Sequence, residues 1–322
     1  MQNIGIDIGG TTIIGGVVDA DGKIILKKST PTLPKRENGL IIADIIALCK
    51  SLISDESISA KDIRSISIGS PGIINPQRGM VINATNLGFI NVPLGDMLKA
   101  ELGYPIHIDN DANCAALGES IFGAAKGSGN SVTITLGTGI GGGIVTNGSI
   151  YAGSFFGAGE VGHHIICMDG EPCCCGMKGC WEAYASASAL IRDTEKAAKS
   201  NPHSKINHII NADMNKITAK TAFAAAAAGD ETAKAVVEQY IDYLCIGLIN
   251  IINILQPETI VIGGGVSGEG SELISMIENR MDKFTPLGDI KTKIALAKLG
   301  NDAGIIGAAQ LGKQSAQMYR SK

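Results

Sequence analysis

The stretch from Gly5 to Ile25, GIDIGGTTIIGGVVDADGKII, decides the fold, because its pattern returns later in the chain. From Thr133 to Tyr151 the sequence reads TITLGTGIGGGIVTNGSIY. Each stretch has an apolar strand, a turn rich in glycine and threonine, a second apolar strand and a hairpin dipeptide, Asp21-Gly22 or Asn147-Gly148. Both dipeptides favour type I′ turns. Two β-hairpins of one design predict a domain plan that occurs twice.

Between and after these stretches, strand patterns alternate with helix patterns, which predicts an α/β fold with layered sheets. No low-complexity linker interrupts the chain, so we expect two tightly joined domains with a cleft between them. The main predicted helices are residues 39–52, 94–102, 113–122, 183–200, 218–253, 271–284 and 303–312. The main predicted strands outside the two hairpins are residues 63–68, 106–108, 259–262 and 293–297.

Composition excludes several classes of protein. The formal net charge is −4 and no basic block is present, so a nucleic-acid surface is not expected. The apolar run from Leu244 to Leu255 contains Gly247, Asn250 and Asn253, and we interpret it as a buried helix, not a membrane span. The first residues carry no export signal, and the eight cysteines then belong in a reducing compartment. The sequence therefore predicts a cytoplasmic protein.

Three glycine-rich turns point to a nucleotide. In the first, Gly9-Gly10-Thr11-Thr12 joins two strands, where backbone N–H groups can approach phosphate oxygens. Asp7 just before it can hold Mg²⁺, through water. The pattern is neither a P-loop nor a Rossmann fingerprint, because a strand follows it and not a helix. Alone it would be a tight hairpin, but Gly137-Thr138-Gly139 and Gly263-Gly264-Gly265 offer two more turns.

A cluster of cysteines predicts a structural zinc ion. Cys173, Cys175 and Cys180 supply three thiolates, and either His163 or His164 supplies an imidazole. Three cysteines and one histidine form a tetrahedral set that zinc prefers, and four protein ligands leave no open position for catalysis. Cys174 is an additional cysteine, which we expect to point away from the metal.

Carboxylates that could serve acid–base chemistry lie in two places. Asp109-Asn110-Asp111 follows a short apolar strand, and α/β proteins bind ligands at such strand ends. Either aspartate could accept the proton of a hydroxyl that attacks a phosphate, although both also suit a helix N-cap. Glu160 precedes the metal histidines and Glu182 follows the last cysteine, so a zinc ion would tie both to one point.

Taken together, these motifs resemble the ROK family, which contains repressors, open reading frames and sugar kinases. The resemblance covers essentially the whole chain, and the zinc segment with GEVGH is its specific part. The motifs are DIGGTT at residues 7–12, DNDAN at 109–113, LGTGIGGG at 136–143, GAGEVGH at 157–163, CCCGMKGCWE at 173–182 and IVIGGG at 260–265. Many members of the family carry lysine where this chain has Thr12.

The resemblance implies a duplicated actin-like ATPase fold with ATP in the cleft between two domains. It implies a small domain of residues 1–112 plus about 303–322, and a larger domain of residues 113–302 with the zinc loop. Asp111 would be the general base, and His163 would bind zinc with Cys173, Cys175 and Cys180. The implied ATP site is Asp7, Gly9, Gly10, Thr11, Thr12, Gly137, Thr138, Gly139, Gly263, Gly264 and Gly265. The implied sugar site is Gly72, Asn86, Asn110, Asp111, Gly139, Glu160, His163 and Glu182.

Our leading hypothesis from the sequence is a glucokinase that converts glucose and ATP to glucose 6-phosphate and ADP, with Mg²⁺ on the phosphates. An N-acetylmannosamine or N-acetylglucosamine kinase is the alternative, because the loop from Gly72 to Asn86 decides whether an acetamido group fits. A sugar-responsive repressor is less favoured, since only two residues precede the first strand. The family resemblance also implies a homodimer.

Overall fold

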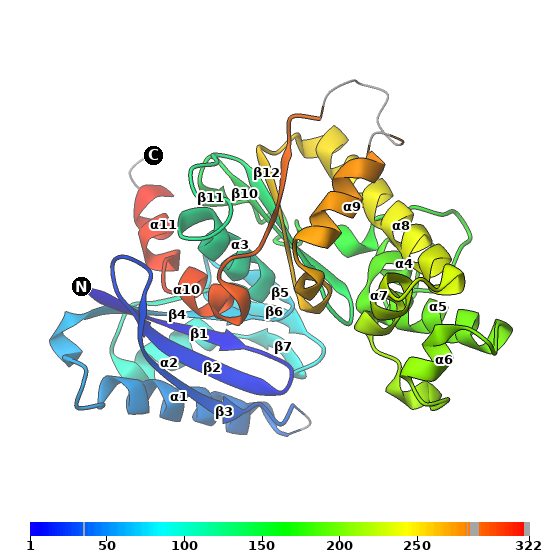
Figure 1. The fold of residues 1–322 in the computed structure, drawn as a ribbon. Coiled ribbons are helices and arrows are strands. Elements are labelled where there is room, and N and C mark those ends of the chain that lie inside the picture. Colours follow the sequence, from blue (N-terminus) through cyan, green and yellow to red (C-terminus); the bar gives the residue numbers. More distant parts are fainter. Residues whose placement is uncertain (35, 282, 284–289, 319–322) are drawn as a thin grey trace. The chain divides into compact units, whose positions relative to one another are not determined.

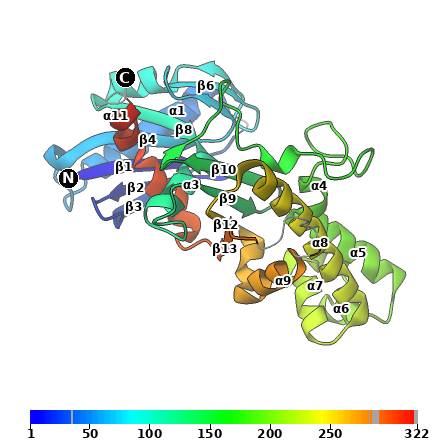
Figure 2. The same cartoon turned by 90° about the horizontal axis from the view of Figure 1, so that it is seen from above.

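The computed structural model of the protein describes residues 1–34, 36–281, 283 and 290–318. Contacts between Cα atoms divide this chain into two compact units. Unit 1 consists of Met1–Thr133, Gly143–Gly159 and the described chain from Lys298 onward, and unit 2 consists of Ile134–Gly142 and Glu160–Ala297. Figures 1 and 2 show the course of the chain in two views.

Unit 1 is built on a mixed sheet whose strand order is β3-β2-β1-β4-β8. The predicted hairpin forms β1 and β2, which pair antiparallel up to Ile8 and Ile13, while β4 and β8 run parallel to β1. The strands are β1 Gln2–Ile8, β2 Thr12–Val18, β3 Ile24–Pro31, β4 Ile63–Ser70 and β8 Ile106–Asn110. A separate small antiparallel sheet contains β5 Ile73–Asn75, β6 Met80–Ala84 and β7 Phe89–Val92.

Helices cover both faces of the unit 1 sheet (Figure 1). On one face, α1 (Asn38–Ile53) buries isoleucine and leucine residues spaced three and four apart, which is the period of an amphipathic helix. It shares a core with the sheet and with α2 (Leu94–Leu102). The other face carries α3 (Asp111–Ile121), α10 (Ala303–Ala308) and α11 (Leu311–Met318), whose buried residues form smaller clusters. The carboxyl end of β8 thus leads directly into α3.

The second sheet has the strand order β11-β10-β9-β12-β13. Its hairpin β9–β10 repeats the glycine-rich turn of β1–β2, as the sequence predicts, and β12 pairs parallel with β13. The division between the two compact units runs through β9 and β10. The strands are β9 Ser131–Leu136, β10 Ile140–Thr146, β11 Ser149–Ile150, β12 Thr259–Gly263 and β13 Lys293–Leu296.

The two hairpin dipeptides behave differently. Asn147 and Gly148 both have positive φ, 51° and 71°, as a type I′ turn requires. At the other site Gly22 has φ 83° while Asp21 is not among the described residues with positive φ, so the type I′ prediction is wrong there. The connection is longer because Asp19 caps it: its Oδ1 accepts the N–H groups of Asp21 and Lys23, at 3.0 and 2.9 Å.

Unit 2 carries most of the remaining helices, and two predicted helices are interrupted. The predicted helix 218–253 is two helices, because Gly229 adopts φ 82° and Asp230 then caps the next helix by accepting Ala233 N–H at 2.7 Å. The predicted helix 183–200 likewise breaks at Ser186, whose hydroxyl accepts Ala189 N–H. The helices are α4 Glu182–Ala185, α5 Ala187–Ser200, α6 Lys205–Ile209, α7 Ala219–Ala227, α8 Glu231–Leu255 and α9 Ser271–Met281.

Short 3₁₀ turns connect several of these elements, and they are η1 Ala60–Asp62, η2 Val161–His163, η3 Met214–Lys216, η4 Gly265–Glu269 and η5 Gly300–Asp302. The predicted continuation of α9 to Phe284 falls on residue 284, which lies outside the described residues. Among the described helices, only α8 has the length and composition of a membrane span, and half of its most apolar window is buried inside the protein. The core helix of a globular protein meets the same criteria.

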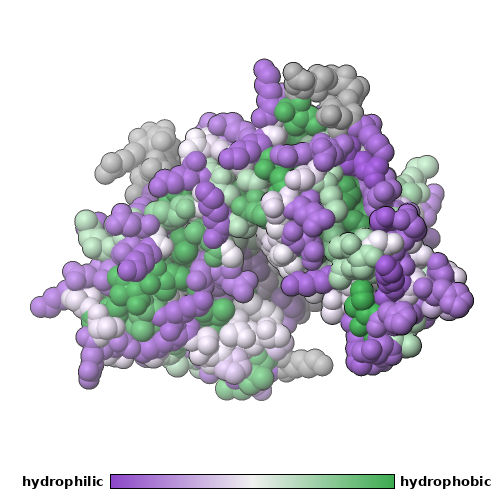
Figure 3. Space-filling view, in the orientation of Figure 1, coloured by the Kyte–Doolittle hydropathy of each residue, from purple (hydrophilic) through white to green (hydrophobic). Residues whose placement is uncertain are grey.

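The compact units differ from the predicted domains. The predicted small domain stops at residue 112, whereas unit 1 also contains α3 and the segment Gly143–Gly159. Compactness does not say which parts move together, so the division into a small and a large domain stays a prediction. On the face shown in Figure 3, hydrophilic residues surround separate apolar patches, as is usual for a globular protein.

Candidate active site and metal centre

The turn after β1 is closed by backbone hydrogen bonds. Gly9 N–H donates to Thr12 O at 3.0 Å, and a Cβ at residue 9 would lie only 2.8 Å from that oxygen. The Thr32 hydroxyl donates to Gly9 O at 2.7 Å, and Thr32 N–H donates to Thr11 O at 2.9 Å. Gly10, by contrast, has open space around it. The turn is therefore held rigid from one side and open on the other, which suits an approaching anion.

Asp7 lies two residues before this turn, near the end of β1, and its carboxyl group is largely shielded from water. Burial, and secondarily the Asp111 carboxylate, raises the pKa of Asp7 to about 7. Helix α10 packs directly against the Asp7 carboxyl group: a Cβ on Gly304 would lie 2.6 Å from Asp7 Oδ2. A second carboxylate near a buried one favours a cation beside the pair, because the cation offsets their repulsion. These residues therefore fit a divalent cation.

The two aspartates at the end of β8 have different environments. Asp109 is buried, its Oδ1 accepts hydrogen bonds from Asn113 Nδ2 at 2.9 Å and from Asn110 N at 2.7 Å, and burial raises its pKa. Asp111 is half-buried at the first position of α3, and its Oδ1 accepts Ala112 N–H at 2.9 Å. Asp109 is thus enclosed at the base of α3, whereas Asp111 is partly exposed.

Of the residues predicted to bind sugar in unit 1, Asn110 and Gly72 lie together. Asn110 Nδ2 donates to Gly72 O at 3.0 Å, while its Oδ1 accepts Asn113 N–H at 3.1 Å and so caps α3. Gly72 has φ 93°, and a Cβ there would lie 2.0 Å from Asn83 O, so no other residue fits. Asn86 lies on the exposed turn between β6 and β7. Asn110 thus caps α3 and contacts Gly72 within the protein. Its Nδ2 keeps one further N–H to donate, and its Oδ1 can accept one further hydrogen bond.

The two glycine turns of unit 2 lie next to each other. Gly137 N–H donates to Gly139 O at 3.0 Å, and the Ser188 hydroxyl holds Thr138 O at 2.7 Å. Gly264 has φ 85°, and a Cβ there would lie 2.5 Å from the backbone of Leu136, immediately before the second turn. Glycine at residue 264 therefore lets the third turn pack against the second.

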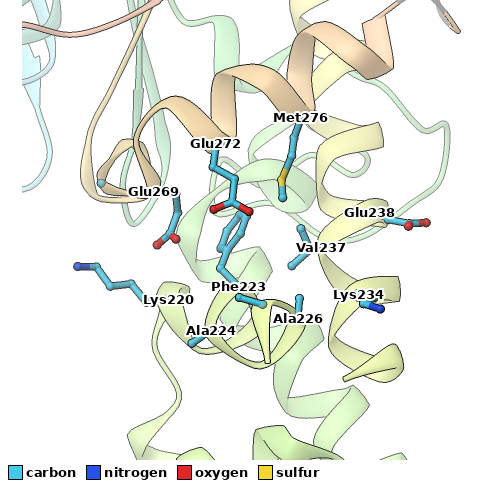
Figure 4. Close-up of a pocket in the computed structure, with 12 residues that line it drawn as sticks. Lys220, Phe223, Ala224, Ala226, Lys234, Val237, Glu238, Glu269, Glu272 and Met276 are labelled. Carbon is cyan, nitrogen blue, oxygen red and sulfur yellow. The ribbon is translucent and has the colours of Figure 1, made fainter. Parts of the chain in front are cut away.

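A cavity of about 500 Å³ opens beside the third turn, between α7, α8, η4 and α9 (Figure 4). Phe223, Val237 and Met276 supply its apolar surface, and Glu269 and Glu272 project over Phe223 from the side of η4 and α9. Burial raises the pKa of Glu269. The sequence analysis missed this cavity, because its lining residues are spread over separate helices and form no motif. Only the position of η4, which begins at the last glycine of Gly263-Gly264-Gly265, could have indicated it.

The predicted zinc ligands converge. The ligand atoms of His163, Cys173, Cys175 and Cys180 all lie within 4.8 Å of one another. Cys173 Sγ is 3.6 Å from His163 Nδ1, and Cys175 Sγ is 3.6 Å from Cys180 Sγ. Tetrahedral zinc with Zn–S bonds of about 2.3 Å needs ligand atoms about 3.7 Å apart. Two pairs of ligand atoms already have this spacing and all of them lie within 4.8 Å, so the four side chains fit a zinc ion with small adjustments of their side chains.

The choice between the two histidines follows from their surroundings. His164 turns its Nδ1 to Val161 O at 2.5 Å, and its ring packs on Trp181 with ring centroids 5.2 Å apart. Burial lowers the pKa of His164. His163 faces the cysteines with Nδ1 and places Nε2 4.0 Å from Glu160 Oε2. His163 is thus the histidine of the cluster.

Glu182 lies beside the cluster and contacts the second glycine turn. Its Oε2 accepts Ile140 N–H at 2.8 Å, and a Cβ on Gly139 would lie 2.2 Å from that oxygen. Its Oε1 is 3.0 Å from Cys174 Sγ. Glu160 is exposed. Within unit 2 the structure therefore gathers Gly139, Glu160, His163 and Glu182 around one metal cluster, while Asp7, Gly72, Asn110 and Asp111 belong to unit 1.

Comparison with known proteins places the chain in a family. The profile of the ROK family matches residues 3–315. The chain is 40% identical to a glucokinase of Halalkalibacterium halodurans, over 97% of this chain and 94% of that one. It is 37% identical to a glucokinase of Thermotoga maritima, over 98% of each chain.

Among solved structures, a ROK family glucokinase from Streptomyces griseus in complex with glucose and AMPPNP matches with a TM-score of 0.81. The sequences are 33% identical, and the match covers 98% of this chain and 100% of that chain. The duplicated actin-like ATPase fold expected from the motifs is thereby confirmed. With a family profile that spans nearly the whole sequence and relatives that match end to end, this chain belongs to the ROK family.

Proposed function

We propose that the protein is a glucokinase that transfers the γ-phosphoryl group of ATP to the 6-hydroxyl of glucose. The glucokinases among its relatives support the reaction and the substrate. The single observation that carries the mechanism is the pair of carboxylates in unit 1, Asp7 at a glycine turn and Asp111 at the start of α3. Burial, and secondarily the nearby Asp111, raises the pKa of Asp7 to about 7. Phosphoryl transfer needs a cation-binding carboxylate and a base in this proximity.

In this proposal Asp111 accepts the proton of the glucose 6-hydroxyl. The freed oxygen forms a bond to the γ-phosphorus, the bond from that phosphorus to the bridging oxygen breaks, and ADP leaves with the electron pair. Asp109 does not take this role, because its Oδ1 already accepts two hydrogen bonds inside the protein. Asp111 is half-buried at the first position of α3, so its carboxylate is more exposed to solvent than that of Asp109.

For the nucleotide, we assign the phosphates to the turns at Gly9–Thr12 and Gly137–Gly139, and the base to the cavity of Figure 4. Phe223, Val237 and Met276 offer the apolar surface on which a purine ring packs. Glu269 and Glu272 could accept hydrogen bonds from ring or amino N–H groups. A Mg²⁺ ion near Asp7 would neutralise charge on the transferred phosphate.

For the sugar, we assign Gly72, Asn86 and Asn110 from unit 1, and Gly139, Glu160, His163 and Glu182 from unit 2. Carboxylates and an imidazole accept hydrogen bonds from sugar hydroxyls. Zinc would be structural, because four protein side chains complete its coordination. Its contribution is to hold Glu160, His163 and Glu182 in place.

The test is an assay that couples ADP release to a recorded signal, with glucose, mannose, allose, fructose, N-acetylmannosamine and N-acetylglucosamine as acceptors. We expect the highest kcat/KM with glucose. A higher kcat/KM with an N-acetylated sugar would assign the alternative substrate, and no turnover with any hexose would overturn the proposal.

Replacement of the base gives a second, sharper test. Asp111→Asn should lower kcat by about 10²-fold or more, because the amide cannot accept the proton, while glucose binding remains. Asp96→Asn is the matched control, since Asp96 is an exposed aspartate in the first turn of α2. If Asp111→Asn keeps the wild-type kcat, Asp111 is not the base.

Location and oligomeric state extend the proposal. We infer a cytoplasmic homodimer from the composition of the chain and from its family. Light scattering on the purified protein tests the oligomeric state, and a monomer at micromolar concentration would contradict it.

A further inference from the structure

Cys174 stands between two of the predicted zinc ligands and lies outside the set of His163, Cys173, Cys175 and Cys180; its own thiol groups with Cys173 and Glu182. Its neighbours Cys173 and Cys175 belong to the set whose ligand atoms lie within 4.8 Å of one another. Its own thiol lies 3.0 Å from Glu182 Oε1 and acts as the donor. The side chain is thus turned from the metal to the carboxylate that we assign to the sugar.

Glu182 is held on both of its oxygens. Ile140 N–H donates to Oε2 at 2.8 Å, and the Cys174 thiol donates to Oε1 at 3.0 Å. Two donors on opposite oxygens fix the plane of the carboxylate, whereas one donor leaves the terminal torsion free to rotate. With its plane fixed, the Glu182 carboxylate presents its remaining lone pairs in a defined direction, in which a ligand hydroxyl can donate to them.

The zinc ligands cannot replace this donor. Cys173 Sγ also lies near Glu182 Oε1, at 3.7 Å. A cysteine that binds zinc does so as a thiolate, which has no proton to donate. With the metal bound, Cys173 would face Glu182 as a second negative charge, and Cys174 would be the thiol that still donates to Oε1.

We propose that Cys174 is a positioning residue for sugar binding: its thiol holds Glu182 in the orientation that receives a sugar hydroxyl. This inference rests on the proposed function, since it gives Glu182 the task of binding the sugar. Cys174 itself does not touch the substrate. Its effect should therefore appear in the affinity for the sugar and not in the affinity for ATP.

The experiment compares Cys174→Ala, Cys174→Ser and wild type as zinc-loaded full-length proteins. Cys174→Ala should raise the KM for glucose roughly fivefold, as expected for the loss of one hydrogen bond, with kcat and the KM for ATP nearly unchanged. Cys174→Ser should restore the wild-type KM, because a hydroxyl donates to the same oxygen. The matched control is Cys167→Ala, which removes another exposed cysteine.

Zinc content and sugar binding without turnover complete the test. Elemental analysis should give one zinc per chain for every variant. The single tryptophan, Trp181, directly precedes Glu182, so its fluorescence can report glucose binding. An unchanged glucose KM in Cys174→Ala, or a Cys174→Ser variant no better than Cys174→Ala, overturns the inference. Loss of zinc from both variants also overturns it, because Cys174 would then belong to the metal site. A wild-type protein without hexose kinase activity instead refutes the proposed function.

Discussion

At the residue scale, the surroundings of Asp7 disfavour the charged form of its carboxyl group. Its carboxylate is charged at neutral pH only at a cost, because burial and Asp111 raise its pKa to about 7. Gly304 packs against the carboxyl group and leaves no space for a side chain at that position. Strongly shifted pKa values are typical of functional sites, where side chains are arranged for binding or catalysis at a cost in stability.

Asp7→Asn should therefore stabilise the protein without metal or nucleotide. A raised folded-state pKa contributes stability that is complete below about pH 4 and is lost as pH rises through about 7. The neutral amide avoids this loss, so at pH 8 in a chelator the variant should gain about 2–4 kcal/mol. The gain should shrink towards pH 4, and kinase activity should fall. Chemical denaturation at several pH values measures it.

The exposed Asp21 provides the control, since Asp21→Asn should leave the pH dependence unchanged. Equal stability of wild type and Asp7→Asn at pH 8 would mean that burial does not disfavour the charged Asp7 carboxylate as described.

At the residue scale, the sequence left two choices between neighbouring residues open, and both depend on the surroundings of the side chains. Asp109 and Asp111 differ in burial, and His163 and His164 differ in which atoms their rings face. Neighbouring residues of the same type cannot be told apart by spacing alone.

At the scale of elements, a buried carboxylate in α3 connects distant parts of unit 1. Glu119 is fully buried, and its oxygens accept the N–H groups of Ala124, Lys298 and Leu299 at 2.7, 2.9 and 2.8 Å. Glu119 thereby provides hydrogen-bond acceptors for the backbone N–H groups of Lys298 and Leu299, where the chain re-enters unit 1 before α10. No sequence motif indicates this contact, because the partners Lys298 and Leu299 contribute backbone groups 179 and 180 residues away.

Glu119→Gln should destabilise unit 1 although it changes few atoms. The amide keeps one accepting oxygen and places an NH₂ group among backbone donors, which leaves a buried N–H unsatisfied. A loss of about 2–4 kcal/mol is expected, seen as a lower denaturation midpoint by circular dichroism. Glu101→Gln is the control, because Glu101 forms an exposed surface ion pair with Lys50. If both variants unfold at the same midpoint, the assigned role of Glu119 is wrong.

At the same scale, the prediction of one continuous helix over residues 218–253 was wrong, although the sequence contains the signals for the boundary between α7 and α8. The alanine-rich segment before it has strong helix propensity, which concealed the boundary. Gly229 followed by Asp230 is nevertheless an ordinary stop and start signal, with glycine after one helix and an N-cap before the next. The missed cavity between α7, α8 and α9 is different, because it exists only once three helices have packed.

At the scale of the whole molecule, the metal cluster is expected to support both stability and sugar binding. A zinc-selective chelator, used with excess Mg²⁺, should lower the denaturation temperature and raise the KM for glucose more than the KM for ATP. The reason is that Cys180, Trp181 and Glu182 are consecutive, and Trp181 is fully buried with its Nε1–H bonded to Tyr243 O at 2.9 Å. Release of Cys180 would loosen this anchor, and Trp181 fluorescence would record it.

Zinc added back should restore both properties, whereas added Mg²⁺ should not. Protein purified without chelator should contain one zinc per chain. A zinc content near zero, in protein with full activity, would contradict a structural metal at His163, Cys173, Cys175 and Cys180.

The sequence by itself determined the features that depend on local spacing: the two glycine-turn hairpins, the strand–helix alternation, the family motifs and the group of cysteines. Backbone turns and ligand spacing are short-range properties, so a linear pattern records them. Only the tertiary structure decided that Asp109 is enclosed, that His163 faces the cysteines, that Cys174 turns to Glu182 and that a cavity opens beside the third turn. Burial and side-chain direction arise when distant segments pack together, and no single segment of the sequence contains that information.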